Sequence, residues 1–446
     1  MSDKPYRRLS PLTPVARSGI FVVAVVFATW RDLLRGDLGP FALVLLGLLI
    51  AGLIYGGASW LLTKYWIEAD ELRVDTGVIA RQSRRIRIDR LQGVDIVQPF
   101  VARLLGLAEL RMDVAGGGKR EGSLAFLSLP DARELKDVLL ARRDAARTDT
   151  SPLPDESSEG ASNPSATSAR SQVEPDRLLA LVDLRMLLLS TLLTPEAIAL
   201  VVVALGSVVL PLLVDDFGRV GVSLPLVGGL ALVVFRKIAG SYRFTVSQTH
   251  AGLQVRRGLF ELSSQTIALN RLQGVVLSEP LLWRQLGWVR LDVSIAGYAA
   301  SSDGEGGPSA STVLPVGDRA LAMWLAQRML DGVDLDQTML TRAPEQARWV
   351  SPIGRRFMGF GTDESLTVSR TGWFNRRTHV VPHARVQSLR VTQGPVQRRL
   401  GLADVHVDSP PGPVTVRARD RLATEARTIL EQEITLSRQA RVPSTP

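Results

Sequence analysis

Arginines gather in one short segment of the chain, where they could bind a phosphate or another anion. The segment holds Arg81, Arg84, Arg85 and Arg87, and a smaller group near the C-terminal end holds Arg376 and Arg377. A guanidinium matches the geometry of a phosphate, and each basic residue beside a membrane attracts anionic lipid by roughly 1 kcal/mol. The alternative is a solvated strand face, and the sequence leaves both interpretations open.

Other residue types that could do chemistry are poorly placed for it. His379 and His383 are four positions apart, but the intervening Val380, Val381 and Pro382 disfavour the helix that a metal pair would need. The run from Gly116 to Lys119 lacks the remaining residues of a phosphate loop and predicts a hairpin turn. Cysteine is absent. We therefore expect no catalytic residue, no metal site and no cofactor.

The arginine-rich segment belongs to a module that occurs three times. The chain reads RLQGV at Arg90 and Arg271, and RVQSL at Arg385, with a glutamine two positions later in each case: Gln92, Gln273 and Gln387. A glycine lies thirteen positions before each of these arginines: Gly77, Gly258 and Gly372. A second arginine follows thirteen positions later (Arg103, Arg284, Arg398), and then a second glycine (Gly106, Gly287, Gly401). We call these aligned positions the repeat frame; it predicts three copies of one module, as separate domains.

The repeated arginines and glutamines could contact a ligand. Because all three copies retain them, we favour a structural role, such as an arginine that binds backbone carbonyls at a strand turn. The glycines Gly77, Gly258 and Gly372 are expected to supply turns with positive φ.

Within each copy, the hydrophobic pattern predicts short strands followed by one helix. In copy one, Ile86 and Ile88 alternate with arginines, which indicates a strand with its isoleucines inward. Closing helices are expected to begin near Pro130, Asp318 and Asp420. Such an order predicts a small, strongly bent sheet or open barrel capped by its last helix.

Long apolar segments predict two membrane hairpins. Gly39–Leu62 carries no charge and is long enough to cross a bilayer, and a shorter apolar run precedes it. Pro195–Val214 and Val220–Phe235 are expected to form the second hairpin, after an interfacial helix at Leu178–Leu193. Basic residues at their flanks predict that both termini and all three copies lie on the cytoplasmic side of the cell membrane. No ionisable residue lies at the middle of a predicted span, which disfavours transport.

These patterns set the expected domain boundaries. They are a cytoplasmic N-terminus (1–14), a first hairpin (15–63), copy one (64–143), a disordered linker (144–176), an interfacial helix and second hairpin (177–237), copy two (238–331), a linker (332–348), copy three (349–436) and a disordered tail (437–446).

The order of hairpin, strands, R-[LV]-Q, R-x-x-G and closing helix resembles the bacterial pleckstrin-homology-like (PH) membrane proteins. The resemblance covers about Leu12–Arg142 and Leu178–Glu433, and HARVQSLRVTQGPVQRRLGLADVHV in copy three is its most family-like stretch. It implies a multidomain membrane protein with four transmembrane helices and three PH-like split β-barrels, each of seven strands closed by a C-terminal helix. Many PH-like domains bind anionic lipid head groups or proteins.

The formal net charge of +9 favours a polyanionic partner, and the apolar segments favour a membrane over nucleic acid. An aromatic-rich basic platform for nucleic acid is not evident. We therefore expect a non-enzymatic binding or scaffold protein whose partners are the bilayer, anionic lipids, and a protein partner or a second copy of the chain. The alternative is an accessory subunit of a membrane transport or export complex.

Overall fold

The computed structural model describes most of the three copies and the second apolar segment. It describes residues 7–8, a few positions between 47 and 60, and 61–68, 71–76, 82–114, 123–148, 177–214, 218–249, 252–296, 311–330, 332–333, 335 and 338–441. The chain divides into two compact units, Met1–Arg177 with Phe260–Thr266, and Leu178–Leu259 with Ile267–Pro446. Copies two and three therefore share a unit, and one short piece of copy two belongs to the first unit.

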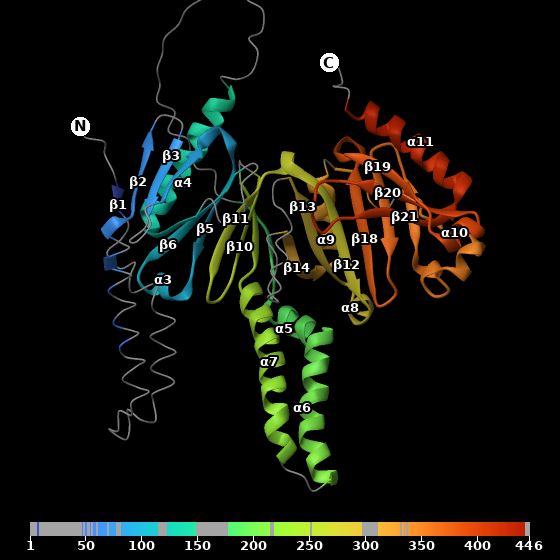
Figure 1. Cartoon of the computed structure of the whole chain (residues 1–446), viewed down its shortest axis with the longest axis horizontal. Helices are drawn as coiled ribbons and strands as arrows, with labels where there is room; N and C mark the ends of the chain where they lie inside the picture. Colours follow the sequence, from blue (N-terminus) through green and yellow to red (C-terminus); the bar gives the residue numbers. More distant parts are fainter. Residues whose placement is uncertain are drawn as a thin grey trace, which may run out of the picture. The chain divides into compact units, whose positions relative to one another are not determined.

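Copy one is built from two antiparallel sheets and a closing helix (Figure 1). The first sheet has the order β1-β2-β3-β4, and the second contains β7-β6-β5. The strands are β1 (Arg7–Arg8), β2 (Lys64–Glu68), β3 (Glu71–Thr76), β4 (Gln82–Arg87), β5 (Leu91–Gln98), β6 (Leu107–Val114) and β7 (Ser123–Ser128). The helices are η1 (Ile88–Arg90), α3 (Phe100–Leu104) and α4 (Leu129–Thr148).

The core of copy one follows the alternation in the sequence. Ile86 and Ile88 are buried, as predicted, and they pack with Leu72 and Leu110. Helix α4 covers this core with Leu139 and its neighbours along one helical stripe. It begins at Leu129, next to the predicted start, and continues to Thr148, beyond the expected boundary.

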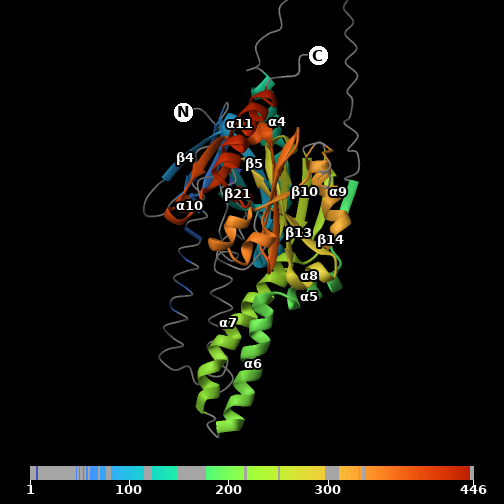
Figure 2. The same ribbon diagram turned by 90° about the vertical axis from the view of Figure 1, so that its right-hand side faces the viewer.

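The second unit contains three helices and the rest of copy two. The helices are α5 (Leu184–Leu192), α6 (Pro195–Val214) and α7 (Gly218–Ser241). Copy two supplies β8 (Arg177–Leu181), β9 (Thr245–Thr249), β10 (Gly252–Arg257), β12 (Leu272–Pro280), β13 (Trp288–Ile295), β14 (Thr312–Asp318), η2 (Leu269–Arg271), α8 (Leu281–Gln285) and α9 (Arg319–Met329). Helices α6 and α7 lie side by side and project away from the strands in both views (Figures 1 and 2).

Copy three completes the second unit. Its strands are β15 (Thr341–Arg342), β16 (Gly359–Thr362), β17 (Leu366–Thr371), β18 (Asn375–Pro382), β19 (Ser388–Thr392), β20 (Leu402–Asp408) and β21 (Val416–Leu422). Its helices are η3 (Glu345–Trp349), η4 (Gly354–Phe357), η5 (His383–Arg385), α10 (Pro395–Arg399) and α11 (Ala423–Gln439). Helix α11 begins three residues later than expected, because Asp420 still belongs to the last strand.

Strands of successive copies pair with each other, and this differs from the expected separate barrels. A seven-stranded sheet has the order β14-β13-β12-β18-β17-β16-β15, so it joins copy two to copy three. In the first unit, β11 (Leu262–Ile267) of copy two pairs with β5 of copy one. An unpaired strand edge exposes a row of N–H and C=O groups, and a neighbouring edge strand can satisfy them. Sequence periodicity indicates strands and gives no information about which edge pairs with which.

The two pairings between copies have the same register. Glu279 lies opposite Arg376 where β12 meets β18. The positions that correspond to these two residues in the repeat frame are Gln98 and Leu262, and they also lie opposite each other. The module therefore carries one defined mode of strand addition, which the chain uses twice.

The apolar segments agree with the predictions in part. Helix α6 has the predicted bounds. The expected interfacial helix is shorter, because Arg177–Leu181 forms β8, and the Val182 amide continues the pairing by donating to the Phe244 carbonyl (3.0 Å). Among the described residues, no helix alone has the length and apolar composition to span a membrane, although α5 and Pro195–Val209, bent by 61°, meet that test as a pair. The first predicted hairpin lies largely outside the described residues, so four spans are not confirmed.

Candidate membrane and partner-binding surfaces

The arginine-rich segment of copy one forms strand β4. Arg84, Arg85 and Arg87 are exposed, and Arg81 lies outside the described residues. The Arg87 guanidinium donates to the Asp89 carboxylate (2.7 Å), and this hydrogen bond lowers the pKa of Asp89. Arg84 and Arg85 are candidates for binding an anion because of their exposure on this strand.

Position in the sheet explains why β4 tolerates these charges. In the described part of the chain, β4 is the last strand of its sheet, whereas the equivalent strand β18 is paired on both sides, with β12 and β17. In the repeat frame, Arg85 corresponds to Thr266 and to Val380, which is fully buried. Charged side chains on an edge strand also oppose unwanted pairing with another chain.

The two arginines predicted in copy three have different surroundings. Arg376 forms an ion pair with Glu279 across the boundary between copies two and three, while Arg377 is exposed. Arg319 at the start of α9 also contacts Glu279 (2.5 Å). The Glu279 side chain is 7% exposed, so the arginines compensate a buried charge. Arg376 thus holds two copies together, and Arg377 remains a candidate for binding an anion.

A cavity of about 180 Å³ lies beside this ion cluster. Glu279, Arg319 and Arg370 line it together with apolar side chains of β12, β17 and β18. Ligand pockets usually measure about 300–1,000 Å³. We therefore assign no ligand to this cavity.

In copies two and three, the first repeated arginine binds backbone carbonyls. Arg271 donates to the Ala296 carbonyl (2.9 Å), and Arg385 donates to the Asn270 carbonyl (2.9 Å). Gln273 donates to the carbonyl of Arg271 (3.1 Å). Arg90 is exposed. These bonds fix turns within copy two and between copies two and three.

The R-x-x-G part of the repeat connects the short helix to the closing helix. The amide of Gly106 donates to the Arg103 carbonyl (3.1 Å), and the Gly106 carbonyl accepts from the first residue of α4, Leu129 (3.1 Å). The same bonds recur at Gly287 and Gly401. All three glycines have a φ between 63° and 71°, which suits the residue after a helix. Arg284 adds a bond to the Trp373 carbonyl (2.9 Å), whereas Arg398 is exposed.

The first repeated glycine lies in a tight turn between two strands. Gly258 and Gly372 have φ angles of 113° and 94°, in the left-handed region that favours glycine. Gly77 and the Gln92 side chain lie outside the described parts of the structure, and Gln387 is exposed.

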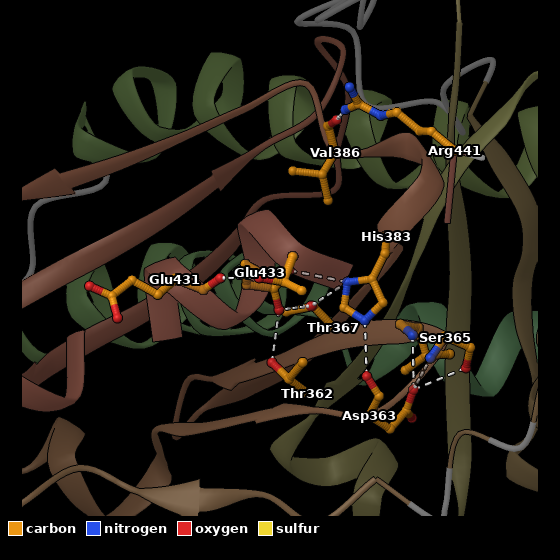
Figure 3. Close-up of polar contacts among 11 residues, drawn as sticks. Thr362, Asp363, Ser365, Thr367, His383, Val386, Glu431, Glu433 and Arg441 are labelled. Atoms are coloured by element: carbon orange, nitrogen blue, oxygen red, sulfur yellow. Dashed lines mark hydrogen bonds and ion pairs between the residues drawn. The ribbon is translucent and has the colours of Figure 1, made fainter. Parts of the chain in front are cut away.

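His383 belongs to a buried polar cluster in copy three (Figure 3). Its Nδ1 contacts the Glu433 carboxylate of α11 (3.1 Å), and its Nε2 contacts the Asp363 carbonyl (3.0 Å). Thr362 and Thr367 donate to the same carboxylate. Burial lowers the pKa of His383, but the hydrogen bond and charge of Glu433 outweigh it, and the net shift is upward. With both ring nitrogens facing acceptors, the imidazolium fits this site.

The other histidines have a different chemistry. Burial, with the charges of Arg377 and Arg419, lowers the pKa of His379 to about 4. Its Nδ1 accepts from the Thr415 amide (3.2 Å), which suits a neutral ring. Burial also lowers the pKa of His406. His250 is outside the described residues, and within them no three His, Asp or Glu side chains converge as metal ligands.

Two functional positions of the junction and core were not predicted from the sequence. Glu279 occupies a repeat-frame position that holds Gln98 and Gln393 in the other copies, and each of those glutamines donates to a backbone carbonyl of its own copy. The replacement of this glutamine by a glutamate in copy two was the feature of the sequence that could have indicated a special role for position 279. Glu433 is buried on α11 together with Ala426 and Ser437, and the residue types around it in the sequence did not indicate this.

The surfaces of the second unit also include exposed apolar side chains near α5. Trp283 of α8 donates its indole N–H to the Ser190 carbonyl of α5 (3.0 Å). Next to α8, the turn between β17 and β18 presents Trp373 and Phe374. Copy two is thus attached directly to α5, and copy three is attached to α8 of copy two.

Repeated β-sheet modules, each closed by a helix, define a protein built from PH-like domains. The chain belongs to the bacterial PH domain family, whose model matches residues 18–143, 184–332 and 344–433. The family resemblance found in the sequence is confirmed. The chain is similar to the UPF0699 transmembrane protein YdbT of Bacillus subtilis (strain 168), with 25% identity over 286 residues, or 60% of this chain and 56% of that protein. The matched part thus spans little more than half of that relative. No solved structure matches the chain.

Proposed function

We propose that this protein is a non-enzymatic scaffold, anchored in the inner membrane, that holds PH-like modules at the cytoplasmic face. The observation that carries the proposal is the direct attachment of copy two to α5–α7, with copy three joined to copy two through the pairing of β12 with β18. Trp283 binds α5, and the amide of Leu259 donates to the Ala239 carbonyl at the end of α7 (2.8 Å). Such bonds position the modules at a fixed place beside the helices.

Several features support a membrane anchor. Side chains along α6 are apolar and exposed, with Val202 and Leu205 at 63% and 60%. An exposed apolar surface of this extent is costly in water and suits lipid. The name of the Bacillus subtilis relative describes a transmembrane protein.

The partners of the scaffold are anionic lipids or proteins that bind the exposed parts of the modules. Arg84 and Arg85 of copy one and Arg377 of copy three are the candidate anion contacts. Each basic residue close to an anionic membrane contributes roughly 1 kcal/mol, so two arginines change lipid selectivity measurably.

Anchoring and orientation are tested on the full chain in cell membranes. We expect the protein to stay in the pellet after an alkaline carbonate wash; release into the supernatant would contradict an anchor. Because the chain has no cysteine, Gln432→Cys provides a single labelling site in α11. A membrane-impermeant maleimide should label it in inverted vesicles and not in intact spheroplasts. The reverse pattern would contradict a cytoplasmic location.

Lipid binding is tested with the reconstituted protein and spin-labelled lipids. We expect a larger motionally restricted fraction for phosphatidylglycerol than for phosphatidylcholine, and Arg84→Gln with Arg85→Gln should reduce the difference. The matched control removes two exposed arginines of α11, Arg427→Gln with Arg438→Gln. Equal restriction of both lipids in all variants would leave protein partners as the ligands of these modules.

A further inference from the structure

The turn between β17 and β18 presents two aromatic side chains to the outside of the second unit. Trp373 and Phe374 are 43% and 66% exposed. Their rings contact each other, with centroids 4.3 Å apart, and Trp373 also stacks on Phe357 at 6.1 Å. Large aromatic residues are seldom left this exposed without a partner.

The turn is held in place by the neighbouring copy. Arg284 donates to the Trp373 carbonyl (2.9 Å), and the Leu281 amide donates to the Phe374 carbonyl (2.6 Å). Gly372 has a φ of 94°, and a Cβ there would lie 2.0 Å from the Asn375 carbonyl oxygen. The aromatic pair is therefore displayed by a rigid turn, and the repeated Arg284 and Gly372 both serve that turn.

This turn lies at the end of the unit from which the helices project. Leu281 and Arg284, which hold the turn, belong to α8, and Trp283 in the same helix binds α5. Both views show α5 and α8 together at the point where α6 and α7 leave the strands, and α11 at the opposite end (Figures 1 and 2).

The apolar surface continues from the turn to the helices. Leu286, which follows α8, and Leu189 and Leu192 of α5 are each more than half exposed. Beyond them, Val201, Val202 and Leu205 of α6 are also exposed. Arg377, three positions after Phe374, and Arg185, at the start of α5, are also exposed. The arrangement of aromatic, aliphatic and basic side chains is that of a membrane interface.

Copy two has a similar turn, in which a glycine precedes two apolar residues. After Gly258, at φ 113°, come Leu259 and Phe260, which are 36% and 39% exposed. The amides of Gly258 and Leu259 donate to the carbonyls of Tyr242 and Ala239 at the end of α7 (2.9 and 2.8 Å). A glycine followed by two exposed apolar residues, fastened to a membrane-proximal helix, is thus a recurrent feature of the module.

We propose that the β17–β18 turn is a membrane-insertion loop: Trp373 and Phe374 enter the boundary between head groups and acyl chains, with α5 and α8 lying on the same bilayer surface. The partner is the lipid surface itself. The inference rests on the proposed membrane anchor, and it adds a second, separate contact between copy three and the bilayer.

The experiment measures the depth of a nitroxide at this turn. The cysteine-free chain allows Trp373→Cys and Phe374→Cys to be labelled singly in the full protein, reconstituted into vesicles of phosphatidylcholine and phosphatidylglycerol. Val202→Cys in α6 and Gln432→Cys in α11 are the matched controls. Power-saturation spectroscopy then compares collisions with dissolved oxygen and with a water-soluble nickel chelate.

We expect an oxygen-to-nickel ratio at positions 373 and 374 that is several-fold higher than at 432 and lower than at 202. A ratio at both turn positions equal to that at 432, with 202 still protected from nickel, would overturn the insertion loop and leave the anchor intact. If position 202 also collides freely with nickel, the anchor fails and the loop with it. Because Phe374 is largely exposed, its replacement should leave the fold unchanged, which the thermal unfolding midpoint checks.

Discussion

Glu279 and Arg376 face each other across the boundary between copies two and three, and their ion pair is specific to that boundary. At the equivalent place between copies one and two, Gln98 lies opposite Leu262. The backbone pairing is the same at both boundaries, so strand addition does not require the charges. The ion pair adds a side-chain contact to the backbone pairing, and this contact distinguishes the boundary between copies two and three from that between copies one and two.

Glu279→Gln should therefore loosen the junction without abolishing the fold. It removes the charge that compensates Arg319 and Arg376, whose side chains are 46% and 27% exposed. Because both arginines reach solvent, we expect a loss of about 1–3 kcal/mol in the free energy of unfolding, below that of a fully buried pair. Denaturant unfolding of the detergent-solubilised protein measures it.

The same chemical change at an exposed glutamate, Glu364→Gln, is the control for this substitution and should change the stability by less than about 0.5 kcal/mol. Equal stability of the two variants would mean that backbone pairing alone holds copies two and three together.

Much of the local structure follows from the sequence, while the joining of copies does not. Period-two alternation around Ile86 and the helix start before Pro195 were sufficient to place a strand and a helix, although Ile88, expected in the same strand, begins the short helix η1. Both are decided by residues close together in the chain. The pairing of β12 with β18 depends on which strand edge meets which, and about a hundred residues separate Glu279 from Arg376. The repeat frame predicts the register of one pairing between copies only when the register of the other pairing is already known.

His379 should make the protein sensitive to acid. Its pKa falls from the ordinary 6.5 to about 4 in the folded state, so the unfolded chain takes up the proton first. Stability is therefore lost as the pH falls from about 6.5 towards 4, by up to about 3 kcal/mol. His379→Asn keeps an acceptor for the Thr415 amide and should flatten this part of the stability profile. His406, whose pKa is also lowered, leaves some acid sensitivity in that variant. An unchanged acid profile would contradict the role of His379.

His383 should have the opposite effect on the pH dependence of stability, because its charged form is the one that stabilises the fold. Its pKa is raised, so the charged ring stabilises the fold below the unfolded pKa of about 6.5, and this contribution is lost as the pH rises through the folded value. Glu433→Gln removes the carboxylate that holds the proton. We expect it to cost about 1.5–3 kcal/mol near pH 6, typical of a hydrogen bond to a charged group, and to abolish the decline on the alkaline side. Unfolding midpoints of both proteins across this pH range provide the measurement, and parallel curves would contradict it.

The exposure of some candidate site residues follows from the local sequence, and that of others depends on long-range strand pairing. A run of arginines predicts a basic strand, and Arg84 and Arg85 are exposed on one. Arg376 has the same residue type in a similar run, yet it pairs with Glu279 because copy two covers its strand. Whether an arginine can contact a lipid therefore depends on the sheet edge it occupies, which the sequence of its own copy does not contain.

The two repeated glycines should differ in their response to alanine. At Gly401, with φ 63°, a Cβ would have no atom within 4 Å, so Gly401→Ala carries only the cost of a left-handed alanine, about 1–2 kcal/mol. At Gly372, with φ 94°, the Cβ would lie 2.0 Å from the Asn375 carbonyl oxygen, and the turn must change shape. We expect Gly372→Ala to cost on the order of 3 kcal/mol or more, because the contact adds to the backbone strain. Denaturant unfolding of the two variants compares them directly. A smaller loss at Gly372 than at Gly401 would show that the turn between β17 and β18 adapts easily, and that it does not hold Trp373 and Phe374 in a fixed position.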